Sequence, residues 1–595
     1  METKKYSSFD TQHSTNNKTS WRKFLSEFGV AGWMLNVVVG LFILISPVQA
    51  QVSTVSYSTS GPGVNAAITN WGMDTGVFSY DVAQQDLIFM GTNTVNFVQV
   101  VFEADYPLTN NDLTYSQKVD LTNELNLANM ATSANRWILS SGTGAGVDSS
   151  YQSGTGTVYP DRWAAMMSAW QRNYKVTFWF AQPFNEPDYG WGQGSQQNLY
   201  DIIGYLQTSN NFSGTVFGGG CTLNVNYAQS WYDYIASRAS IGTTHTIGGS
   251  AYSYYYFIQA VLSKGGTPIN PECHNISDAI IGAEYGLQGV SWWLAAQRTR
   301  GDFAKTCQGK QLGYADNWNN WTAAAVYRGT NGAIKAFVGG NERSAVTTSY
   351  RFFAKDRDVF YDGDGPRRDY TVSISANQEN VINITNGADV QPKISGRYII
   401  VNRNSGKVLE VPGANTNWGV QLDQSTFVVG ASNQLWDVYQ IGGIDTSYYS
   451  MIAAHSGAGA NLYYNGYSPA GSYALGDAVI QYGTSGGQNN WYFEYAGNGY
   501  FKIHSGWSNK ILGVNGASLN NGAVIVQWDD TGTLDQQWRL IPASVTNFDF
   551  VAPAAPTLVT ASANAVSVQL NWKTNSESDL ASYTVLRSTI DSCII

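Results

Sequence analysis

Two glutamates each end an apolar run that is typical of a β-strand. Glu186 ends the run that starts at Val176, and Glu272 ends the run that starts at Thr267. A pair of carboxyl groups can cleave a glycosidic bond, because one protonates the leaving oxygen while the other, in its ionised form, attacks the sugar or activates water. A third glutamate, Glu284, competes with Glu272 for the second role.

Alternating strand-like and helix-like stretches between about Val64 and Leu294 must position these carboxyl groups. Such alternation is typical of the α/β class, with a parallel sheet and crossover helices. Eight β/α units fit into about 230 residues, which predicts a closed (β/α)₈ barrel, or TIM barrel. The predicted strands end within 71–74, 98–103, 137–140, 176–186, 215–224, 243–248, 267–272 and 290–294. Active sites of such barrels lie at the carboxyl ends of the strands, so Glu186 on the fourth strand and Glu272 on the seventh would face each other across the mouth.

The tripeptide Asn185-Glu186-Pro187 at the end of the fourth strand resembles the acid/base motif of the clan A glycoside hydrolases. These are retaining (β/α)₈ enzymes that include cellulases, mannanases, xylanases and β-1,3-glucanases. The resemblance implies that Glu186 is the acid/base and that Asn185 hydrogen-bonds the 2-hydroxyl of the substrate. It also implies that the nucleophile ends the seventh strand, where the strand count places Glu272.

Three further observations bear on this resemblance. Glu186 and Glu272 are 86 positions apart, which leaves room for two intervening β/α units. The eighth strand, from Val290, begins too soon after Glu284 for a crossover connection of about ten residues or more, so we favour Glu272 and expect Glu284 on the seventh helix. Gln99 occupies the second strand, where the clan often has an arginine, and this departure leaves the substrate open.

Other side chains near the strand ends are candidates for binding the sugar. By the same resemblance, one of Trp292 and Trp293 would form a platform under the sugar, since neighbours on a strand point to opposite faces. The alternative is that both pack inside the barrel. His245 on the sixth strand would contact the nucleophile or the sugar, although a structural role is also open. The remaining candidates, each with the same structural alternative, are Asp74, Tyr252 and His274.

A repeated motif defines the region 393–545. Trp436, Trp491 and Trp538 each close a segment that opens with an aromatic strand, and they are 55 and 47 residues apart. Three copies of about 50 residues predict a β-trefoil. The Gln-x-Trp-like motifs resemble those of ricin-type lectin domains, in which these residues chiefly build the core; Asn489 replaces the glutamine in the second copy. The resemblance leaves nearby polar residues as candidates for binding sugar, namely Asp423, Gln424, Gln481, Gln527 and Trp528.

The remaining segments complete the predicted organisation. Residues 1–50 combine early lysines with an apolar run and small residues, which predicts a cleaved signal peptide or, alternatively, an uncleaved anchor. We assign 55–316 to the barrel and 317–392, which alternates without long helices, to a small β-sandwich packed on it. Residues 551–595 resemble the opening strands of a fibronectin type III module, too short for a complete sandwich, and we expect this piece to be poorly ordered.

Composition narrows the function classes. The net charge of −10 and the lack of a lysine or arginine run argue against a nucleic-acid partner. Aromatic residues make up 14% of the chain, and such rings suit the apolar faces of sugars. The four cysteines have no metal-ligand spacing, and two-carboxylate chemistry requires no cofactor. We expect a secreted, monomeric, endo-acting hydrolase of a polysaccharide; a non-catalytic surface lectin and an exo-acting glycosidase remain as alternatives.

Overall fold

The computed structural model describes residues 52–76, 79–142, 146–153, 157–189, 193–462, 473–483, 489–545, 556–564 and 567–574. The predicted signal peptide, Cys593 and most of the predicted fibronectin-like piece lie outside these residues. Within the described ranges, no helix is both long enough and apolar enough to cross a bilayer.

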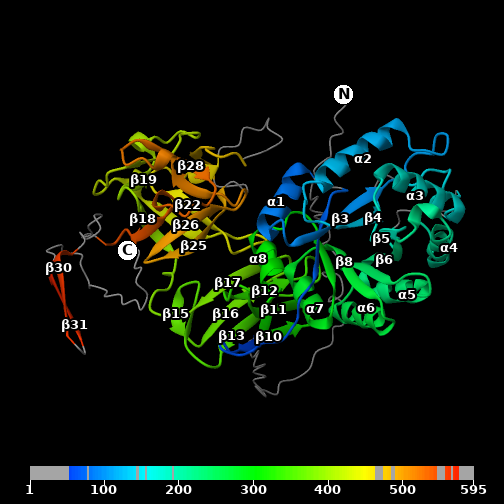
Figure 1. Cartoon of the computed structure of the whole chain (residues 1–595), viewed down its shortest axis with the longest axis horizontal. Coiled ribbons are helices and arrows are strands. Elements are labelled where there is room, and N and C mark those ends of the chain that lie inside the picture. Colours follow the sequence, from blue (N-terminus) through cyan, green and yellow to red (C-terminus); the bar gives the residue numbers. More distant parts are fainter. Residues whose placement is uncertain are drawn as a thin grey trace, which may run out of the picture. The chain divides into compact units, whose positions relative to one another are not determined.

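Eight parallel strands, β2 to β9, close a barrel in chain order, which confirms the predicted fold class (Figure 1). Each predicted strand corresponds to one observed strand. The strands are β2 (Asn70–Asp74), β3 (Val95–Phe102), β4 (Arg136–Ser141), β5 (Phe180–Gln182), β6 (Val216–Asn224), β7 (Ile241–Gly248), β8 (Thr267–Cys273) and β9 (Gly289–Trp292). The connecting helices are α1 (Tyr80–Met90), α2 (Tyr115–Ala128), α3 (Pro160–Tyr174), α4 (Gln196–Gln207), α5 (Val225–Ile235), α6 (Ala251–Ser263), α7 (Ile276–Tyr285) and α8 (Arg298–Thr306).

The limits of α7 fix the loop that carries the Glu272 region. Asn275 begins the helix, because its side-chain oxygen accepts the backbone N–H of Ser277 at 3.0 Å. Gly286 ends the helix in a left-handed conformation with φ of 95°, which glycine adopts without steric cost. Glu284 therefore lies in the last turn of α7, as predicted, and the segment from Glu272 to His274 joins the end of β8 to the start of this helix.

The small β-sandwich consists of two sheets, ordered β1-β13-β16 and β10-β11-β12-β17-β14-β15. Its strands are β1 (Val52–Tyr57), β10 (Lys310–Asn317), β11 (Thr322–Arg328), β12 (Ile334–Gly340), β13 (Thr348–Ala354), β14 (Val359–Tyr361), β15 (Asp364–Arg367), β16 (Asp369–Ile374) and β17 (Glu379–Thr385). The sandwich therefore begins at Lys310 and not at 317. It also includes β1, which precedes the barrel and pairs in parallel with β13; this blue strand lies among the green strands in Figure 1.

The β-trefoil is built from twelve strands, four in each repeat. They are β18 (Gly396–Asn402), β19 (Val408–Glu410), β20 (Asp423–Ser425), β21 (Trp436–Gln440), β22 (Tyr449–Ala453), β23 (Gly459–Leu462), β24 (Val479–Tyr482), β25 (Trp491–Gly497), β26 (Tyr500–Ser505), β27 (Ile511–Val514), β28 (Ala523–Trp528) and β29 (Trp538–Pro542). The three repeat tryptophans are fully buried. Each indole N–H donates to a backbone carbonyl of its own repeat, at 3.0 Å from Trp436, 2.9 Å from Trp491 and 2.8 Å from Trp538. The prediction that these residues build the core is confirmed.

The start of α8 contacts a loop of the trefoil through buried hydrogen bonds. The carboxylate of Asp445 accepts both the backbone N–H and the hydroxyl of Thr299, each at 2.9 Å. The backbone N–H of Arg298 donates to the hydroxyl of Tyr448 at 2.9 Å, and its guanidinium lies over the ring of Tyr492 at 4.7 Å. These contacts join the barrel directly to the trefoil.

Two antiparallel strands, β30 (Thr557–Ala563) and β31 (Val568–Lys573), are the described part of the predicted fibronectin-like segment. Nearly all of their side chains are exposed, including Leu558 at 77%. The described residues of this segment therefore form a hairpin without a hydrophobic core of its own.

Candidate active site

Glu186 lies just beyond the end of β5 in a left-handed backbone conformation, with φ of 52°. This conformation is uncommon for a residue other than glycine, and such strain is concentrated at functional sites. Contacts with β6 hold it in place. The backbone N–H of Glu186 donates to the carbonyl of Cys221 at 2.7 Å, and the carboxylate of Asp188 accepts the backbone N–H groups of Leu223 and Asn224, each at 2.9 Å.

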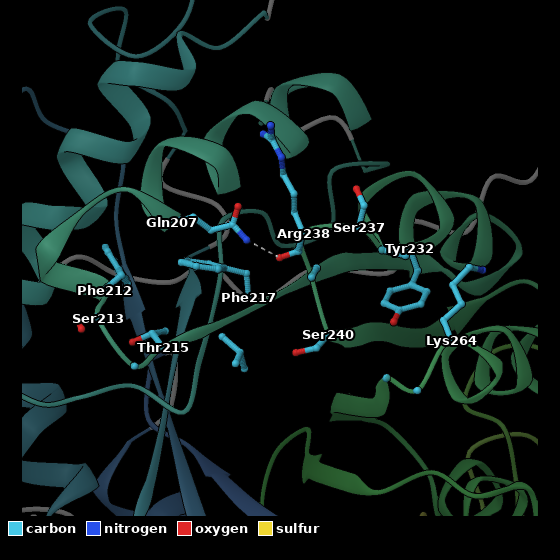
Figure 2. A pocket seen from close by; sticks show the side chains of 16 residues that line it. Gln207, Phe212, Ser213, Thr215, Phe217, Tyr232, Ser237, Arg238, Ser240 and Lys264 are labelled. Carbon is cyan, nitrogen blue, oxygen red and sulfur yellow. Dashed lines mark hydrogen bonds between the residues drawn. The ribbon is translucent and has the colours of Figure 1, made fainter.

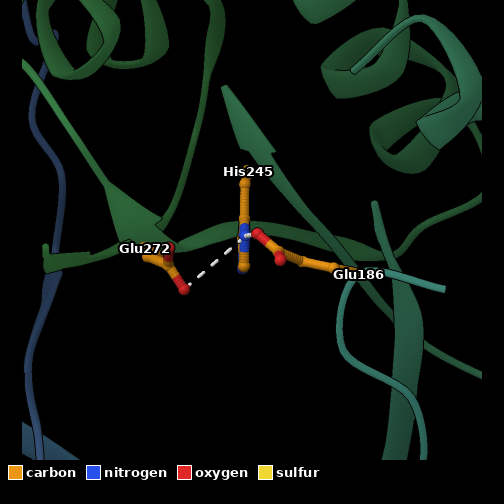
Figure 3. A group of neighbouring side chains, drawn as sticks. All are labelled: Glu186, His245 and Glu272. Atoms are coloured by element: carbon orange, nitrogen blue, oxygen red, sulfur yellow. Dashed lines mark hydrogen bonds and ion pairs between the residues drawn. The ribbon is translucent and has the colours of Figure 1, made fainter. Parts of the chain in front are cut away.

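His245 on β7 lies between the two predicted catalytic carboxylates, as Figure 3 shows. Its Nδ1 is 2.9 Å from Oε1 of Glu186 and 3.6 Å from Oε2 of Glu272. The nitrogen and one oxygen of each glutamate all lie within 4.8 Å of one another. The structure thus brings together three of the residues that the sequence singled out, from the ends of β5, β7 and β8.

The other ring nitrogen of His245 contacts a buried thiol. Nε2 lies 3.2 Å from Sγ of Cys221, and the thiol donates its own proton to Oδ1 of Asn185 at 3.1 Å. Because the thiol proton is used in that bond, Nε2 must donate to the sulfur. Nδ1 faces the carboxylate oxygens of Glu186 and Glu272, which are also acceptors. Both ring nitrogens are donors only in the imidazolium form.

The electrostatic environment of His245 agrees with this assignment. Burial by itself lowers the pKa of the imidazole. The interactions with Cys221 and Glu272 and the hydrogen bond to Glu186 outweigh burial and raise the pKa well above its ordinary value. His245 therefore carries a positive charge between the two carboxylates.

Of the two adjacent tryptophans, only Trp293 reaches the site. Its ring stacks on His274 with centroids 5.4 Å apart, and its side chain is half-buried. Trp292 is 1% exposed and stacks on Trp71 at 5.5 Å, with the guanidinium of Arg300 over its ring. Of the two tryptophans that were candidates for the sugar platform, the structure thus leaves Trp293, because strand alternation turns Trp292 into the packing beneath the barrel helices.

His274 lies directly beside Glu272. Its Nε2 is 3.1 Å from Oε1 of Glu272. Burial lowers the pKa of His274, but its hydrogen bonds to Glu272 and to Glu342 raise it, with a net rise above the ordinary value.

Asp74 on β2 belongs to the same electrostatic cluster. Burial raises its pKa to about 7, and the negative charge of Glu272 acts in the same direction. Its carboxylate accepts the amide of Gln99 at 3.1 Å and the backbone N–H of Gly76 at 2.9 Å. Tyr252, in contrast, is 44% exposed on α6 and packs edge-on against Trp318 at 4.6 Å. No interaction among the described residues links Tyr252 to the carboxylates, so the prediction that it binds sugar has no support from the structure.

Four residues that the sequence analysis did not place in the site contribute to it. Cys221 and Gln182 line the buried side of Asn185 and His245, since the amide of Gln182 donates to the thiol at 3.3 Å. Gln99 contacts Asp74, and Glu342 contacts His274. Two of the four, Gln99 and Gln182, have a buried amide oxygen that finds no hydrogen-bond partner among the described residues. Gln99, Gln182 and Cys221 lie on barrel strands, and this position could have indicated a role in the site. Glu342 follows β12 of the sandwich, and no pattern in the sequence around it points to the barrel.

A metal is not required to explain this cluster. The ring nitrogen of His245 and one oxygen of each glutamate are close enough to one another to surround a cation. The same nitrogen, however, already serves as the hydrogen-bonded partner of a carboxylate. Two carboxylates that share a histidine can also take part in proton transfer.

In the trefoil, three of the predicted sugar contacts are structural. Gln424, Gln481 and Gln527 are each 0% exposed. Each amide nitrogen donates to at least one backbone carbonyl, and that of Gln527 also donates to the carboxylate of Asp477. Each amide oxygen accepts a serine hydroxyl, at 2.6, 3.1 and 2.6 Å respectively. The prediction that these glutamines bind sugar is wrong, because loops from elsewhere in the trefoil cover them completely.

The other two trefoil candidates differ in their surroundings. Burial and the neighbouring Glu410 together raise the pKa of Asp423 to about 7, with burial as the larger cause. Trp528 is 39% exposed and remains available to a ligand. Glu410, which the sequence analysis did not single out, accepts the amide of Gln434 at 2.7 Å.

A separate pocket of about 580 Å³ lies at the amino-terminal ends of β6, β7 and β8 (Figure 2). The carboxylates lie toward the other end of the barrel strands. The two cationic side chains of the pocket are already paired. Arg238 donates to the carbonyl of Tyr200 at 2.7 Å, and Lys264 forms an ion pair with Asp233. Both side chains are therefore held by contacts with neighbouring helices of the barrel.

Comparisons with known proteins agree with this architecture. Residues 369–482 and 487–571 match the family described as ricin-type beta-trefoil lectin domain-like. No curated protein has significant sequence similarity to the chain.

Several solved structures are similar to parts of the chain. The designed threefold-symmetric protein ThreeFoil is 35% identical over 24% of this chain and 98% of its own, with a TM-score of 0.22. A GH30 endoxylanase from Clostridium papyrosolvens C71 is 14% identical over 56% of this chain and 100% of its own, with a TM-score of 0.39. A glycoside hydrolase family 30 subfamily 8 xylanase from Clostridium acetobutylicum is 14% identical over 57% and 100%, with a TM-score of 0.36. By its strand topology and by the family match, the chain joins a (β/α)₈ barrel to a ricin-type β-trefoil.

Proposed function

We propose that the barrel is a retaining glycoside hydrolase, with Glu186 as acid/base and Glu272 as nucleophile. One observation carries this proposal: the facing oxygens of the two carboxyl groups lie within 4.8 Å of each other, at the carboxyl ends of β5 and β8. Retaining enzymes separate their carboxyl groups by about 5 to 5.5 Å, whereas inverting enzymes need roughly 6.5 to 9.5 Å to admit a water.

The proposed reaction is a double displacement. Glu186 gives its proton to the glycosidic oxygen while the bond from that oxygen to the anomeric carbon breaks and an oxygen of Glu272 bonds to the same carbon. Water then attacks this carbon, gives a proton to Glu186 and releases Glu272. The imidazolium of His245 offsets negative charge as it moves between the two carboxylates. Asn185 would bind the 2-hydroxyl, and Trp293 would lie under the sugar ring.

We further propose an exported, monomeric, endo-acting enzyme on a β-linked polysaccharide. The match of the C-terminal region to ricin-type lectin domains supports a carbohydrate ligand for the trefoil. Weak contacts on a repeated module gain by avidity on a polymer, because each further contact becomes intramolecular. No nucleic-acid partner and no cofactor are part of the proposal.

The test measures release of reducing ends from β-glucans, mannan, xylan, galactan and agar. We expect Glu186→Gln and Glu272→Gln each to lose at least roughly a hundredfold in rate on the polymer that the wild type cleaves, with binding to it intact. Glu284→Gln is the matched control, since Glu284 lies on α7 away from the site, and it should retain wild-type activity. The anomeric form of the first product, followed by NMR, should be that of the substrate.

Other outcomes separate the alternatives. A wild type that binds a polymer but cleaves none of the panel would favour the lectin. Release of single sugars from chain ends alone would indicate an exo-acting glycosidase. An active Glu272→Gln variant would remove Glu272 from the proposed role.

A further inference from the structure

The turn after β12 carries a residue of the β-sandwich to the barrel's active site. Asn341 begins this turn and is fully buried. Its amide nitrogen donates to the carbonyl of Thr246 on β7 at 2.8 Å and to the carboxylate of Asp278 on α7 at 3.2 Å. Its amide oxygen accepts the backbone N–H of Arg343 at 3.2 Å. The turn is thus fixed to two elements of the barrel.

The next residue, Glu342, forms an ion pair with His274. One oxygen of Glu342 contacts Nδ1 of His274, while Nε2 of the same ring faces Glu272 at 3.1 Å. The histidine side chain is 3% exposed and that of Glu342 is 25% exposed. Trp293 covers one face of the imidazole.

We propose that Glu342 is a positioning residue of the active site, which holds the His274 ring between two carboxylates so that it donates a hydrogen bond to Glu272. The inference rests on the proposed function, because it assigns Glu272 as the nucleophile. Both ring nitrogens face carboxylate oxygens, and both can donate only when the ring is an imidazolium. A buried carboxylate next to a donor of fixed position is held in one orientation for attack.

The charges around His274 agree with this role. Besides Glu272 and Glu342, they include Asp278, Arg300 and Arg343. Arg300 donates to the backbone carbonyl of His274 at 2.6 Å, and Arg343 lies 3.9 Å from Glu342. The hydrogen bond from His274 lowers the pKa of Glu342, and the hydrogen bonds to the two glutamates raise that of His274 against the effect of burial. Removal of the Glu342 charge would therefore favour a neutral His274.

The test compares Glu342→Gln, which removes the charge but keeps the shape, with Glu342→Asp, which keeps the charge further from the ring. Asp369→Asn is the matched control, because Asp369 pairs with Arg351 elsewhere in the sandwich. The titration of His274 is followed by NMR of ¹⁵N-labelled imidazoles, and its signal is assigned from a His274→Asn sample. The values of kcat and KM are measured on the polysaccharide that the wild type hydrolyses.

For Glu342→Gln we expect His274 to lose its proton about one pH unit lower or more, as removal of a close opposite charge requires. The value of kcat should fall roughly 10- to 100-fold with KM nearly unchanged. Glu342→Asp should lie between this variant and the wild type, and the control should match the wild type. If Glu342→Gln does not fold, the intermediate behaviour of Glu342→Asp supports the proposal and wild-type behaviour overturns it.

Two results would overturn the inference. One is an unchanged titration of His274 in Glu342→Gln, and the other is a loss of kcat no larger than that of Asp369→Asn. Failure of the proposed function gives a different result. In that case the Glu272→Gln variant stays active, so Glu272 is not the nucleophile, while the titration of His274 still reports its contact with Glu342.

Discussion

The thiol of Cys221 connects the residues beneath the predicted acid/base. It donates to Asn185 and accepts from both His245 and Gln182, so three polar side chains share one buried sulfur. Through His245, the same network reaches Glu186. Sulfur is larger and more polarisable than oxygen, so it can accept two N–H groups at longer distances. The orientation of Asn185 and the protonation of His245 therefore depend on each other.

Asp74 supplies a test of the site's electrostatics at the residue scale. Burial raises its pKa in the folded protein to about 7, while its unfolded value is close to 4. Between these values the folded state keeps a proton that the unfolded state releases, so this group's contribution to stability falls as the pH rises from about 4 to about 7. Above that range both states are ionised and the contribution no longer changes.

We therefore expect Asp74→Asn to become more stable relative to the wild type as the pH rises. Between about pH 4.5 and pH 7.5, the difference in free energy of unfolding should move in favour of the variant by more than about 1 kcal/mol, measured by urea denaturation. Asp358→Asn, at an exposed ion pair of the sandwich, serves as the control and should show no such trend. A pH-independent difference for Asp74→Asn would contradict the raised pKa.

At the scale of the element, each trefoil repeat uses the same two buried polar groups. A tryptophan closes each repeat onto a carbonyl, and a glutamine ties the end of a strand to a neighbouring loop. Buried polar groups stabilise a fold only when they are hydrogen-bonded, and here every one of these six side chains is. The glutamines thus act as fixed connections between strands and loops.

Gln527 and Trp528 are adjacent in β28 but face opposite environments, which allows a matched comparison. Gln527→Ala should destabilise the protein by about 1 to 3 kcal/mol, because polar groups of the covering loop lose their hydrogen-bond partner. The affinity of the folded protein for the polysaccharide should not change. Trp528→Ala should leave the melting temperature unchanged and weaken binding to the polymer. Calorimetry and a pull-down on insoluble polysaccharide measure the two effects. Loss of binding without loss of stability in Gln527→Ala would restore that residue as a sugar contact.

At the scale of the whole molecule, the barrel and the trefoil share a buried hydrogen-bond network. Asp445 and Tyr448 of the trefoil bind the first residues of α8. In the same region, Arg300 on α8 binds the carboxylate of Glu379 at 2.8 Å and the carbonyl of His274 at 2.6 Å. One helix terminus therefore contacts the trefoil, the sandwich and the loop that follows Glu272.

This network predicts that the barrel and the trefoil unfold together. Asp445→Ala removes the acceptor for two groups of Thr299, and we expect calorimetry to resolve two transitions where the wild type shows one. Asp437→Ala, at an exposed ion pair with Arg397 on the trefoil, is the control and should keep a single transition. Two separate transitions already present in the wild type would show that these hydrogen bonds do not couple the domains.

The barrel, the trefoil and the closeness of Glu186 and Glu272 could be predicted from local patterns in the sequence. These features follow from local signals: the period of apolar residues assigns each strand and helix, and a repeat of tryptophans assigns each trefoil unit. Strand order then placed both glutamates at the same end of the barrel, because parallel strands in a closed barrel share one direction. The eight strands and the helical position of Glu284 could thus be predicted.

Contacts between segments that are distant in the sequence could not be predicted and became visible only in the folded chain. The two adjacent tryptophans have different surroundings, which the strand itself does not set. Trp292 contacts Arg300 of α8, and Trp293 stacks on His274. The tertiary structure buried Gln527, whose polar side chain suggests exposure, beneath a loop about 50 residues away. It brought β1 next to β13 and Glu342 next to His274, across separations that no local pattern records. Long-range packing decides such contacts, whereas period and spacing report only the local chain.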